Sequence, residues 1–290
     1  MKIALLSPGH MGSAVGRRLR DHGAEVATCV TGRSQRTQDL AREAGLTLVD
    51  DLETLVADCD VIISILVPAE ALGVAVDVAT AIRAAGRPVV FADLNAISPE
   101  TASAIGELIT AAGATFVDGS IIGPPPTRSG TTRVFVSGPD TSQLQALTEH
   151  GLDVRHVSSS PGAASALKMS FGAITKGTTA LLTQSLVAAA RNDVSGPLLE
   201  ELQERRSALY ELAEGAIPQM PMRSRRWVGE MEEIDDAFVA AGLPGGTFSG
   251  IADLYRWVGR SPLADETPEI LPERTLEQVA ALLAARETPE

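Results

Sequence analysis

The chain has 290 residues, of which 44% are hydrophobic and 21% charged, and a formal net charge of −13 at pH 7. Its length allows two domains with a substantial core, and it has no apolar run long enough to span a membrane. The negative charge and an aromatic content of 3% argue against nucleic acid or an anionic membrane as a partner. Because the sequence starts on a predicted strand, without a charged and then apolar leader, we expect a cytoplasmic protein.

The first predicted strand, Lys2–Leu6, leads into a glycine-containing turn and an amphipathic helix. Such a turn directs backbone N–H groups and the positive end of the helix dipole at one point, which suits a phosphate. In the dinucleotide fingerprint G-x-G-x-x-G the first glycine is replaced by Ser7, but the other two are kept. A simple strand-to-helix turn is the alternative interpretation. The residues that we expect to contact a pyrophosphate are Gly9, His10, Met11 and Gly12.

A second predicted strand, Glu25–Val30, ends on a polar tip where the adenosine ribose of a dinucleotide would lie. An acidic residue at such a tip selects NAD, whereas an arginine accommodates the additional phosphate of NADP. This tip, residues 31–34, contains Arg33 and no acidic residue, so the sequence predicts NADP(H) as the cofactor. The residues expected around the ribose phosphate are Thr31, Arg33 and Ser34.

Short apolar runs alternate with helical stretches through the rest of the first half, which predicts a parallel sheet covered by helices on both faces. The further predicted strands are Leu46–Val49, Val61–Leu66, Pro88–Ala92, Thr115–Val117, Arg133–Val136 and Val154–Val157. Because ligands bind beyond the carboxyl ends of such strands, two tips are expected to contact the cofactor. One tip carries Val67 and Pro68, and the other carries Asn95. The alternatives are a strand-to-helix connection at the first and a turn at the second.

Residues 118–126 follow another predicted strand and are rich in glycine and proline, which predicts a rigid loop. Backbone N–H groups in such a loop are suited to hold an anionic substrate. Ser120, Ile122 and Gly123 are therefore candidate substrate contacts. For Pro125 and Pro126 a stiff surface loop is the simpler interpretation.

The second half of the chain is predicted to be all-helical. No strong helix breaker occurs from Gly162 to about Asn192, and a helix of this length would span roughly 45 Å and connect two domains. We therefore divide the chain into a dinucleotide-binding domain, residues 1–160, and an all-α domain, residues 161–290. Later helices are predicted over Pro197–Glu214, Met220–Ala241, Thr247–Val258 and Thr275–Ala285, with a surface loop over Ser261–Arg274. Because one small helical domain cannot cover so long an apolar helix, we expect a homodimer in which two such helices share a core.

Lys168 occupies an unusual place for a lysine, because its neighbours in the long predicted helix are small or apolar. Burial lowers the pKa of a lysine, and this would suit it to donate and accept a proton near neutrality. Ala164 and Gly172, one turn to either side, leave space for a ligand. A lysine that extends out of an apolar helix toward solvent is the alternative. Lys176, two turns later, is a weaker candidate for a substrate contact.

The chain resembles the β-hydroxyacid dehydrogenases, which include 3-hydroxyisobutyrate and 6-phosphogluconate dehydrogenase and have the imine reductases as a neighbouring branch. Gly9–Gly12 is similar to the Gly-x-Met-Gly turn of this family, and Gly32–Ser34 to the Asn-Arg-Ser/Thr triplet of its NADP-using members. Asp118–Gly123 stands where the family has an Asp-Ala-Pro-Val-Ser-Gly substrate loop. Gly162–Gly172 takes the place of a Gly-x-x-x-x-x-Lys-x-x-x-Asn helix, in which Lys168 corresponds to the catalytic lysine. The second half resembles the less characterised C-terminal domain of some members.

Residues and resemblance together predict an α/β fold: a Rossmann-like doubly wound sheet, a long interdomain helix and an all-α C-terminal domain. The implied activity is NADP(H)-dependent hydride transfer to or from a carbonyl or secondary alcohol, with Lys168 as general acid/base and no metal. Two departures, Ile122 for the serine of the loop and Gly172 for the asparagine of the helix, remove polar groups that would hold a small hydroxy acid. An imine reductase and a non-catalytic NADP-binding sensor are the alternatives; imine reductases generally carry another residue at the lysine position.

Overall fold

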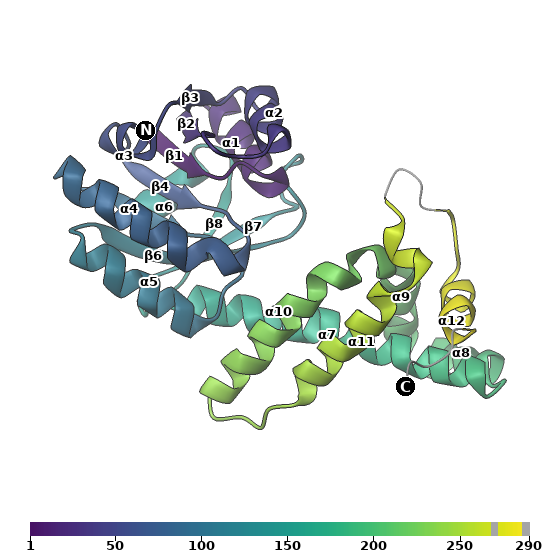
Figure 1. Ribbon diagram of the computed structural model, residues 1–290. Helices are drawn as coiled ribbons and strands as arrows, with labels where there is room; N and C mark the ends of the chain where they lie inside the picture. The colour runs from purple at the N-terminus through teal and green to yellow at the C-terminus, as the bar shows by residue number, and fades with distance from the viewer. Residues whose placement is uncertain (268–271, 286–290) are drawn as a thin grey trace. The chain divides into compact units, whose positions relative to one another are not determined.

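The computed structural model describes residues 1–267 and 272–285. The contacts of the chain divide it into two compact units, Met1–Met169 and Ser170–Glu290. The boundary between them lies inside a single helix, α7 (Ala163–Arg191), rather than in a loop. Figure 1 shows the sheet and its helices in the first unit and helices alone in the second.

Within the described residues, the first unit contains one eight-stranded sheet with the strand order β3-β2-β1-β4-β5-β6-β7-β8. Strands β1 to β6 run parallel to one another, and β7 is antiparallel to β6 and parallel to β8. The strands are β1 Lys2–Leu6, β2 Glu25–Cys29, β3 Thr47–Val49, β4 Val61–Ser64, β5 Val90–Asp93, β6 Thr115–Ile122, β7 Arg133–Ser137 and β8 Asp153–Ser158. This arrangement confirms the predicted doubly wound α/β sheet.

The central strands of the sheet are buried on both faces, because helices cover each face there. In β1, Ile3 and Leu5 join one hydrophobic cluster, and Ala4 and Leu6 join the other. Successive side chains of a strand point to opposite faces, so a strand buried on both sides is apolar throughout. The helices and 3₁₀ turns between the strands are α1 His10–Asp21, α2 Gln35–Glu43, α3 Leu52–Ala57, η1 Pro68–Glu70, α4 Ala71–Ala85, α5 Pro99–Ala111, α6 Ser142–Gln145 and η2 Ala146–Thr148.

The second unit is helical throughout the part that is described. After α7 it contains α8 Ser195–Arg205, α9 Ser207–Ala216, η3 Ile217–Gln219, α10 Pro221–Ala240, α11 Thr247–Gly259, η4 Pro262–Asp265 and α12 Leu276–Ala284. Helices α10 and α11 pack together through buried apolar residues. Trp227 and Tyr255 meet edge to face in this core, with ring centroids 5.3 Å apart.

Three predicted elements differ from the observed ones. The single helix predicted over Pro197–Glu214 is two helices, because Arg206 leaves the helical conformation (φ −146°, ψ 47°). The loop predicted from residue 118 is strand β6 as far as Ile122, because these residues pair with β7. The surface loop predicted over Ser261–Arg274 contains the 3₁₀ turn η4, in which Leu263 and Ala264 are buried; residues 268–271 of that loop lie outside the described residues.

Across residues 1–267 and 272–285, no helix combines the length and the apolar character needed to cross a membrane.

Candidate functional site

A cleft of about 490 Å³ lies at the carboxyl ends of β1, β2 and β4. It brings together three segments that the sequence marks as cofactor contacts: the β1–α1 turn, the tip of β2 and the tip of β4. The residues that line it are Ser7, Gly9, His10, Met11, Gly12, Gly32, Arg33, Ser34, Thr37, Ile65, Leu66, Val67 and Glu70. Three other candidate contacts, Thr31, Pro68 and Asn95, are not in its lining.

The β1–α1 turn is compact, and its conformation explains the glycine pattern. The N–H of Gly9 donates to the carbonyl of Ser7 over 2.7 Å, and Ser7 adopts a left-handed conformation with φ 51°. Glycine adopts this conformation without the steric cost that serine incurs, which accounts for the glycine of the fingerprint at this point. Gly12 is needed for a different reason: an added Cβ would lie 3.2 Å from the carbonyl oxygen of Ser7.

Helix α1 begins at His10 without a capping side chain. In the same unit, α4 and α6 also lack a capping side chain, whereas α2, α3 and α5 are capped by Ser34, Asp51 and Ser98, which accept from backbone N–H groups. The first N–H groups of a helix have no partner within the helix. At α1 they are left for a ligand in the cleft, and together with the helix dipole they favour an anion.

The tip of β2 presents Arg33 to the cleft, while its hydroxyl side chains shape the backbone. The hydroxyl of Thr31 donates to the carbonyl of Asp50 over 2.6 Å, and Ser34 caps α2 by accepting from the N–H of Thr37. Arg33 is exposed. It therefore places a positive charge beside the uncapped end of α1.

Asn95 connects the ends of β4 and β5 beside the cleft. Its side-chain oxygen accepts from the N–H of Leu66, and its nitrogen donates to Ser64 Oγ over 3.0 Å and to Asp93 Oδ2 over 2.9 Å. The side chain is 3% exposed, and its amide makes its hydrogen bonds to other groups of the protein. The segment that it holds leads to Val67, which lines the cleft and is 68% exposed.

Asp93 is completely buried. The pKa of its carboxyl is raised to about 7, mainly by burial; the hydrogen bonds from Asn95 oppose this shift, and the negative charge of Asp118 on the adjacent strand adds to it. A carboxyl group with a raised pKa thus lies behind the tips of β4 and β5.

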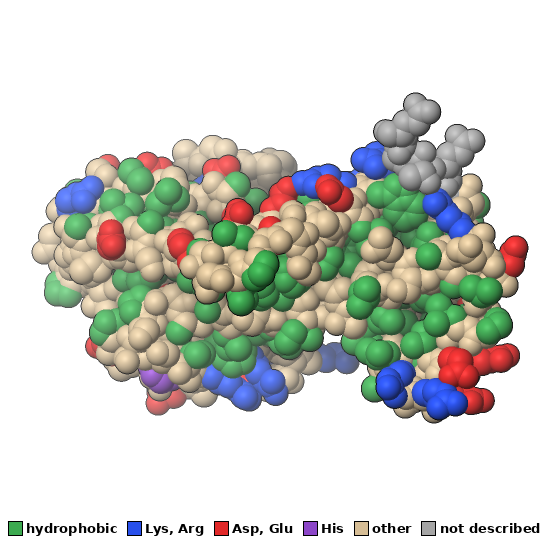
Figure 2. Space-filling model, turned by 90° about the horizontal axis from the view of Figure 1, so that it is seen from below, with side chains coloured by type: hydrophobic (Ala, Val, Ile, Leu, Met, Phe, Trp, Pro, Cys, Tyr) green, Lys and Arg blue, Asp and Glu red, His purple; other side chains and the backbone are tan. Residues whose placement is uncertain are grey.

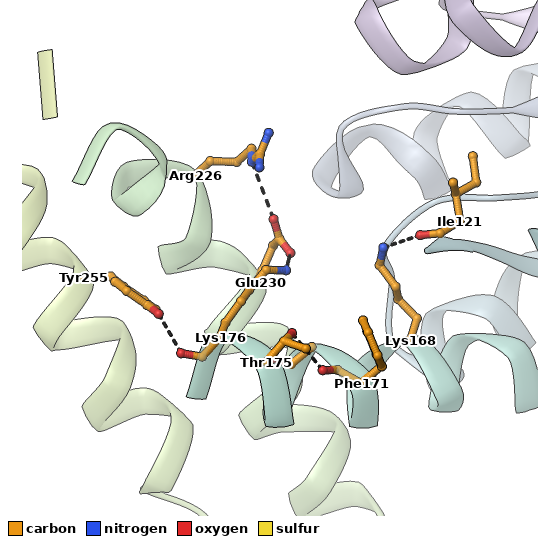
Figure 3. A network of polar contacts seen from close by, with 9 residues as sticks. Ile121, Lys168, Phe171, Thr175, Lys176, Arg226, Glu230 and Tyr255 are labelled. Atoms are coloured by element: carbon orange, nitrogen blue, oxygen red, sulfur yellow. Dashed lines mark hydrogen bonds and ion pairs between the residues drawn. The ribbon is translucent and has the colours of Figure 1, made fainter. Parts of the chain in front are cut away.

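Lys168 lies at the end of β6. Its Nζ donates to the carbonyl oxygen of Ile121, and Figure 3 shows the side chain directed at that carbonyl. Ser120, on the same strand, is fully buried and donates to the carbonyl of Ala164 over 2.9 Å. The start of α7 is thus fixed against β6, with the lysine amine at the tip of the strand.

The other two candidate substrate residues of this segment differ in environment. Ile122 is half-buried, and Gly123 is exposed with φ 125°. An added Cβ on Gly123 would lie 2.9 Å from Thr132 Cα and closer still to the carbonyl oxygen of Thr131. The glycine is therefore required by the backbone of the β6–β7 connection.

Sequence reasoning assigned no function to Asp118, which the structure places at the beginning of α7. Its carboxylate accepts from the N–H groups of Ala164 and Ser165 and from the hydroxyls of Ser137 and Ser165. The only local signal was an acidic residue at the start of the glycine-rich segment. Its partners on α7 are 46 and 47 positions away in the sequence, so the pattern of residues around Asp118 does not reveal them.

In the second unit, Lys176 belongs to a cluster of charged and aromatic residues on α7, α10 and α11 (Figure 3). Its Nζ pairs with Glu230 and lies 5.8 Å from the centroid of the Trp227 ring. Arg226 is the second cation near Glu230, at 3.7 Å, and the hydroxyl of Tyr255 donates to the carbonyl of Lys176 over 2.6 Å. These contacts attach α7 to the α10–α11 pair.

Gly172, one helical turn before Lys176, packs against α10. An added Cβ would lie 3.2 Å from Cδ1 of Ile234. The small residue therefore allows α10 to approach α7 closely.

Comparison with known families assigns the two halves separately. Residues 2–154 match the NAD binding domain of 6-phosphogluconate dehydrogenase, and residues 189–258 match a domain of unknown function, DUF1932. The first match covers more than half of the chain.

Solved structures agree with this assignment. A conserved protein of unknown function, described as structurally similar to 3-hydroxyacid dehydrogenases, is 31% identical with a TM-score of 0.73, over 92% of this chain and 100% of that one. The 3-hydroxyisobutyrate dehydrogenase of Mycobacterium tuberculosis, solved with L-serine, is 19% identical with a TM-score of 0.72, over 98% and 99% of the two chains. An imine reductase from Myxococcus stipitatus in complex with NADP⁺ is 16% identical with a TM-score of 0.58, over 89% and 93%. The last two are similar in fold alone.

The dinucleotide fingerprint, the sheet order and the family match agree. The chain therefore belongs to the family built on the NAD binding domain of 6-phosphogluconate dehydrogenase, within the β-hydroxyacid dehydrogenase-like superfamily that its motifs indicate.

Proposed function

We propose that the protein is an NADP(H)-dependent oxidoreductase that transfers hydride between the nicotinamide and a carbonyl or secondary alcohol. The observation that carries this proposal is the cleft itself, in which the uncapped N-terminus of α1 and Arg33 meet. The first suits a pyrophosphate, and the second suits the additional phosphate of NADP. Gly9 leaves open space beside the same end of α1, and Gly12 allows that end to pack closely on the Ser7 carbonyl, as the last two glycines of the fingerprint do.

Lys168 is the proposed general acid and base. When NADPH is bound, the cofactor supplies the hydride. The Lys168 ammonium then donates a proton to the oxygen of the substrate carbonyl as negative charge develops on it, so that the product is the neutral alcohol. In the reverse direction the neutral amine accepts the hydroxyl proton. The carbonyl of Ile121 holds Nζ at the tip of β6 and limits the positions that it samples.

The substrate class is inferred from Ile122, which supplies no polar side chain where the related substrate loop carries a serine. This favours a substrate that is less polar than a small hydroxy acid. Reduction of an imine is the second candidate, supported by the likeness in fold to an imine reductase that was solved with NADP⁺.

The test is NADPH oxidation with a panel of aldehydes, ketones, β-keto acids and cyclic imines, followed by substitution of the lysine. Lys168→Ala should lower kcat on an accepted carbonyl by about 100-fold or more while the Kd for NADPH changes by less than about threefold. Lys2→Ala, an exposed lysine of the same unit, is the matched control. If kcat survives Lys168→Ala within about tenfold, ~1.4 kcal/mol of barrier, Lys168 is not the general acid.

We also propose a homodimer in which α7 contributes to the interface. Phe171, Ile174 and Leu181 are exposed on this helix, and their spacing of three and seven residues places them along one side. Figure 2 shows that hydrophobic side chains lie in groups on the face seen there. Sedimentation should give a dimer at micromolar concentration and a monomer for Ile174→Asp with Leu181→Asp. A wild-type monomer would refute this assembly.

A further inference from the structure

Asp118 is a fully buried carboxylate at the point where strand β6 meets helix α7. Its Oδ2 accepts from the N–H of Ala164 over 2.9 Å, from the N–H of Ser165 over 3.1 Å and from Ser137 Oγ over 2.8 Å. Its Oδ1 accepts from Ser165 Oγ over 2.6 Å. Both oxygens act as acceptors, so the arrangement suits the ionised carboxylate, which carries no proton to donate.

The two backbone donors belong to the first turn of α7, where N–H groups lack partners within the helix. A negative charge at that end is also favoured by the helix dipole. A buried carboxylate is tolerated when hydrogen bonds and dipoles compensate for its desolvation, and this arrangement provides both. The hydrogen bonds of the Asp118 carboxylate therefore hold the first turn of α7 against β6 and fix the direction in which the helix starts.

Two further contacts connect the same strand to the same helix. Ser120, two residues along β6 and therefore on the same face as Asp118, donates to the carbonyl of Ala164. That carbonyl is the one that accepts from the N–H of residue 168 in an α-helix. Lys168 then donates from Nζ to the carbonyl of Ile121. Asp118, Ser120 and Ile121 thus hold successive points along the first two turns of α7.

We propose that Asp118 is the positioning residue for Lys168: by anchoring the first turn of α7 to β6, it keeps the lysine amine at the tip of the strand. The importance of this position for catalysis rests on the function proposed above, but the anchoring itself does not. A residue that only stabilised the fold would change the free energy of unfolding without changing the environment of one particular amine. If Asp118 positions the lysine, its substitution must also change the environment of the Lys168 amine.

The first experiment therefore measures the amine directly and needs no substrate. The lysines of the chain are Lys2, Lys168 and Lys176, so trace acetylation at a fixed pH, followed by peptide mass spectrometry, reports each one separately. Lys2 lies in the same unit as Lys168, paired with Asp58 on the surface, and serves as the internal reference. In Asp118→Asn the ratio of acetylation at Lys168 to that at Lys2 should rise about threefold or more, because the amine is released from its fixed position.

Asp51→Asn is the matched control variant. Asp51 also caps a helix of the first unit, since its carboxylate accepts from the N–H of Thr54 over 2.7 Å, but α3 carries no candidate site residue. This variant makes the same carboxylate-to-amide change at a helix N-terminus and should leave the acetylation ratio unchanged. If Asp118→Asn fails to fold, Ser165→Ala, which removes only the Oδ1 contact, should give a smaller rise in the same ratio.

An unchanged ratio in a folded Asp118→Asn or Ser165→Ala variant overturns the proposal, whatever its melting temperature. A second measurement separates this result from the fate of the proposed function. With an accepted carbonyl substrate, Asp118→Asn should lower kcat by about tenfold or more and change the Kd for NADPH by less than about threefold. If acetylation rises but no panel member is reduced by the wild type, the anchoring stands and the oxidoreductase assignment falls.

Discussion

The side-chain oxygen of Asn95 accepts a hydrogen bond from the backbone N–H of Leu66 and so joins the tips of two neighbouring parallel strands. Leu66 lines the cleft and Asn95 does not, so the wall of the cleft depends on a residue behind it. The amide also satisfies Asp93 and Ser64, which are both buried. A single side chain therefore maintains the local shape on which cofactor binding is proposed to depend.

Asn95→Ala should lower the free energy of unfolding by about 1–3 kcal/mol, because it leaves buried polar groups without partners. It should also weaken NADPH binding, since the Leu66 segment loses its support. Urea denaturation and fluorescence titration with NADPH measure the two effects. Asn192→Ala is the control: Asn192 is exposed at the end of α7, and its loss should change stability by less than about 0.5 kcal/mol. Equal effects of the two substitutions would contradict this role.

Arg33→Ala should raise the Kd for NADPH by about 10-fold to 100-fold and leave the Kd for NADH nearly unchanged, because a charged hydrogen bond to the additional phosphate contributes about 1.5–3 kcal/mol. Arg42→Ala is a suitable control, since Arg42 lies on the following helix and pairs with Asp39 on the surface. Titration of NADPH and NADH against the wild type, Arg33→Ala and Arg42→Ala checks the prediction. Parallel weakening of NADH and NADPH would argue against selection of the phosphate by Arg33.

Asp93 should make stability depend on pH in a defined direction. Its pKa is raised from 3.8 to about 7, so the folded protein binds this proton more tightly than the unfolded chain does. The resulting stabilisation is complete below about pH 4 and is lost as the pH rises through about 7. The free energy of unfolding of wild type minus that of Asp93→Asn should therefore fall across this interval and then level off.

Chemical denaturation at a series of pH values measures that difference. Asp140→Asn provides a contrast of opposite sign, because hydrogen bonds from Ser142 lower the pKa of the exposed Asp140. The contribution of that carboxylate is lost as the pH falls through its folded pKa, which lies below its ordinary value. A flat difference for Asp93→Asn between pH 4 and 7 would show that Asp93 is ionised throughout.

Gly16→Ala should destabilise the first unit by about 1–3 kcal/mol. An added Cβ would lie 2.9 Å from the Cδ2 atoms of both Leu5 and Leu46, so either these two buried side chains or α1 would have to shift. Gly73→Ala on α4 is the matched control, because an added Cβ there meets no atom of the described residues within 4 Å. It should stabilise by about 0.5–1 kcal/mol through helix propensity. Thermal denaturation of both variants tests the contrast.

The cofactor half of the fold could be predicted because its determinants are local. Apolar strands, a glycine turn and helix-capping residues follow one another within short stretches, and the family match agrees with them. Residues 118–122 were predicted as part of a loop because the segment 118–126 is rich in glycine and proline. Pairing with β7, a tertiary contact, makes them a strand. The break at Arg206 had no glycine or proline to indicate it.

The candidate site could be predicted only in part, because a sequence pattern reveals only what neighbouring residues determine. Residues that line the cleft stand at strand tips, which a sequence pattern reveals. The functions of Asn95 and Asp118 depend on partners that are distant in the chain: Leu66 is 29 positions from the first, and Ala164 is 46 from the second. Their residue types suggest a turn or a loop, and only the fold shows what they hold.

Because α7 crosses the boundary between the two contact units, the protein has no natural point of separation there. Proteases and successful truncations favour exposed loops, so digestion is expected to leave this helix intact. A fragment that ended at Met169 would place Lys168 in a frayed last turn, next to its new C-terminus. Dissection of the cofactor-binding half should therefore retain the whole of α7, to Arg191, so that the lysine keeps its helical setting.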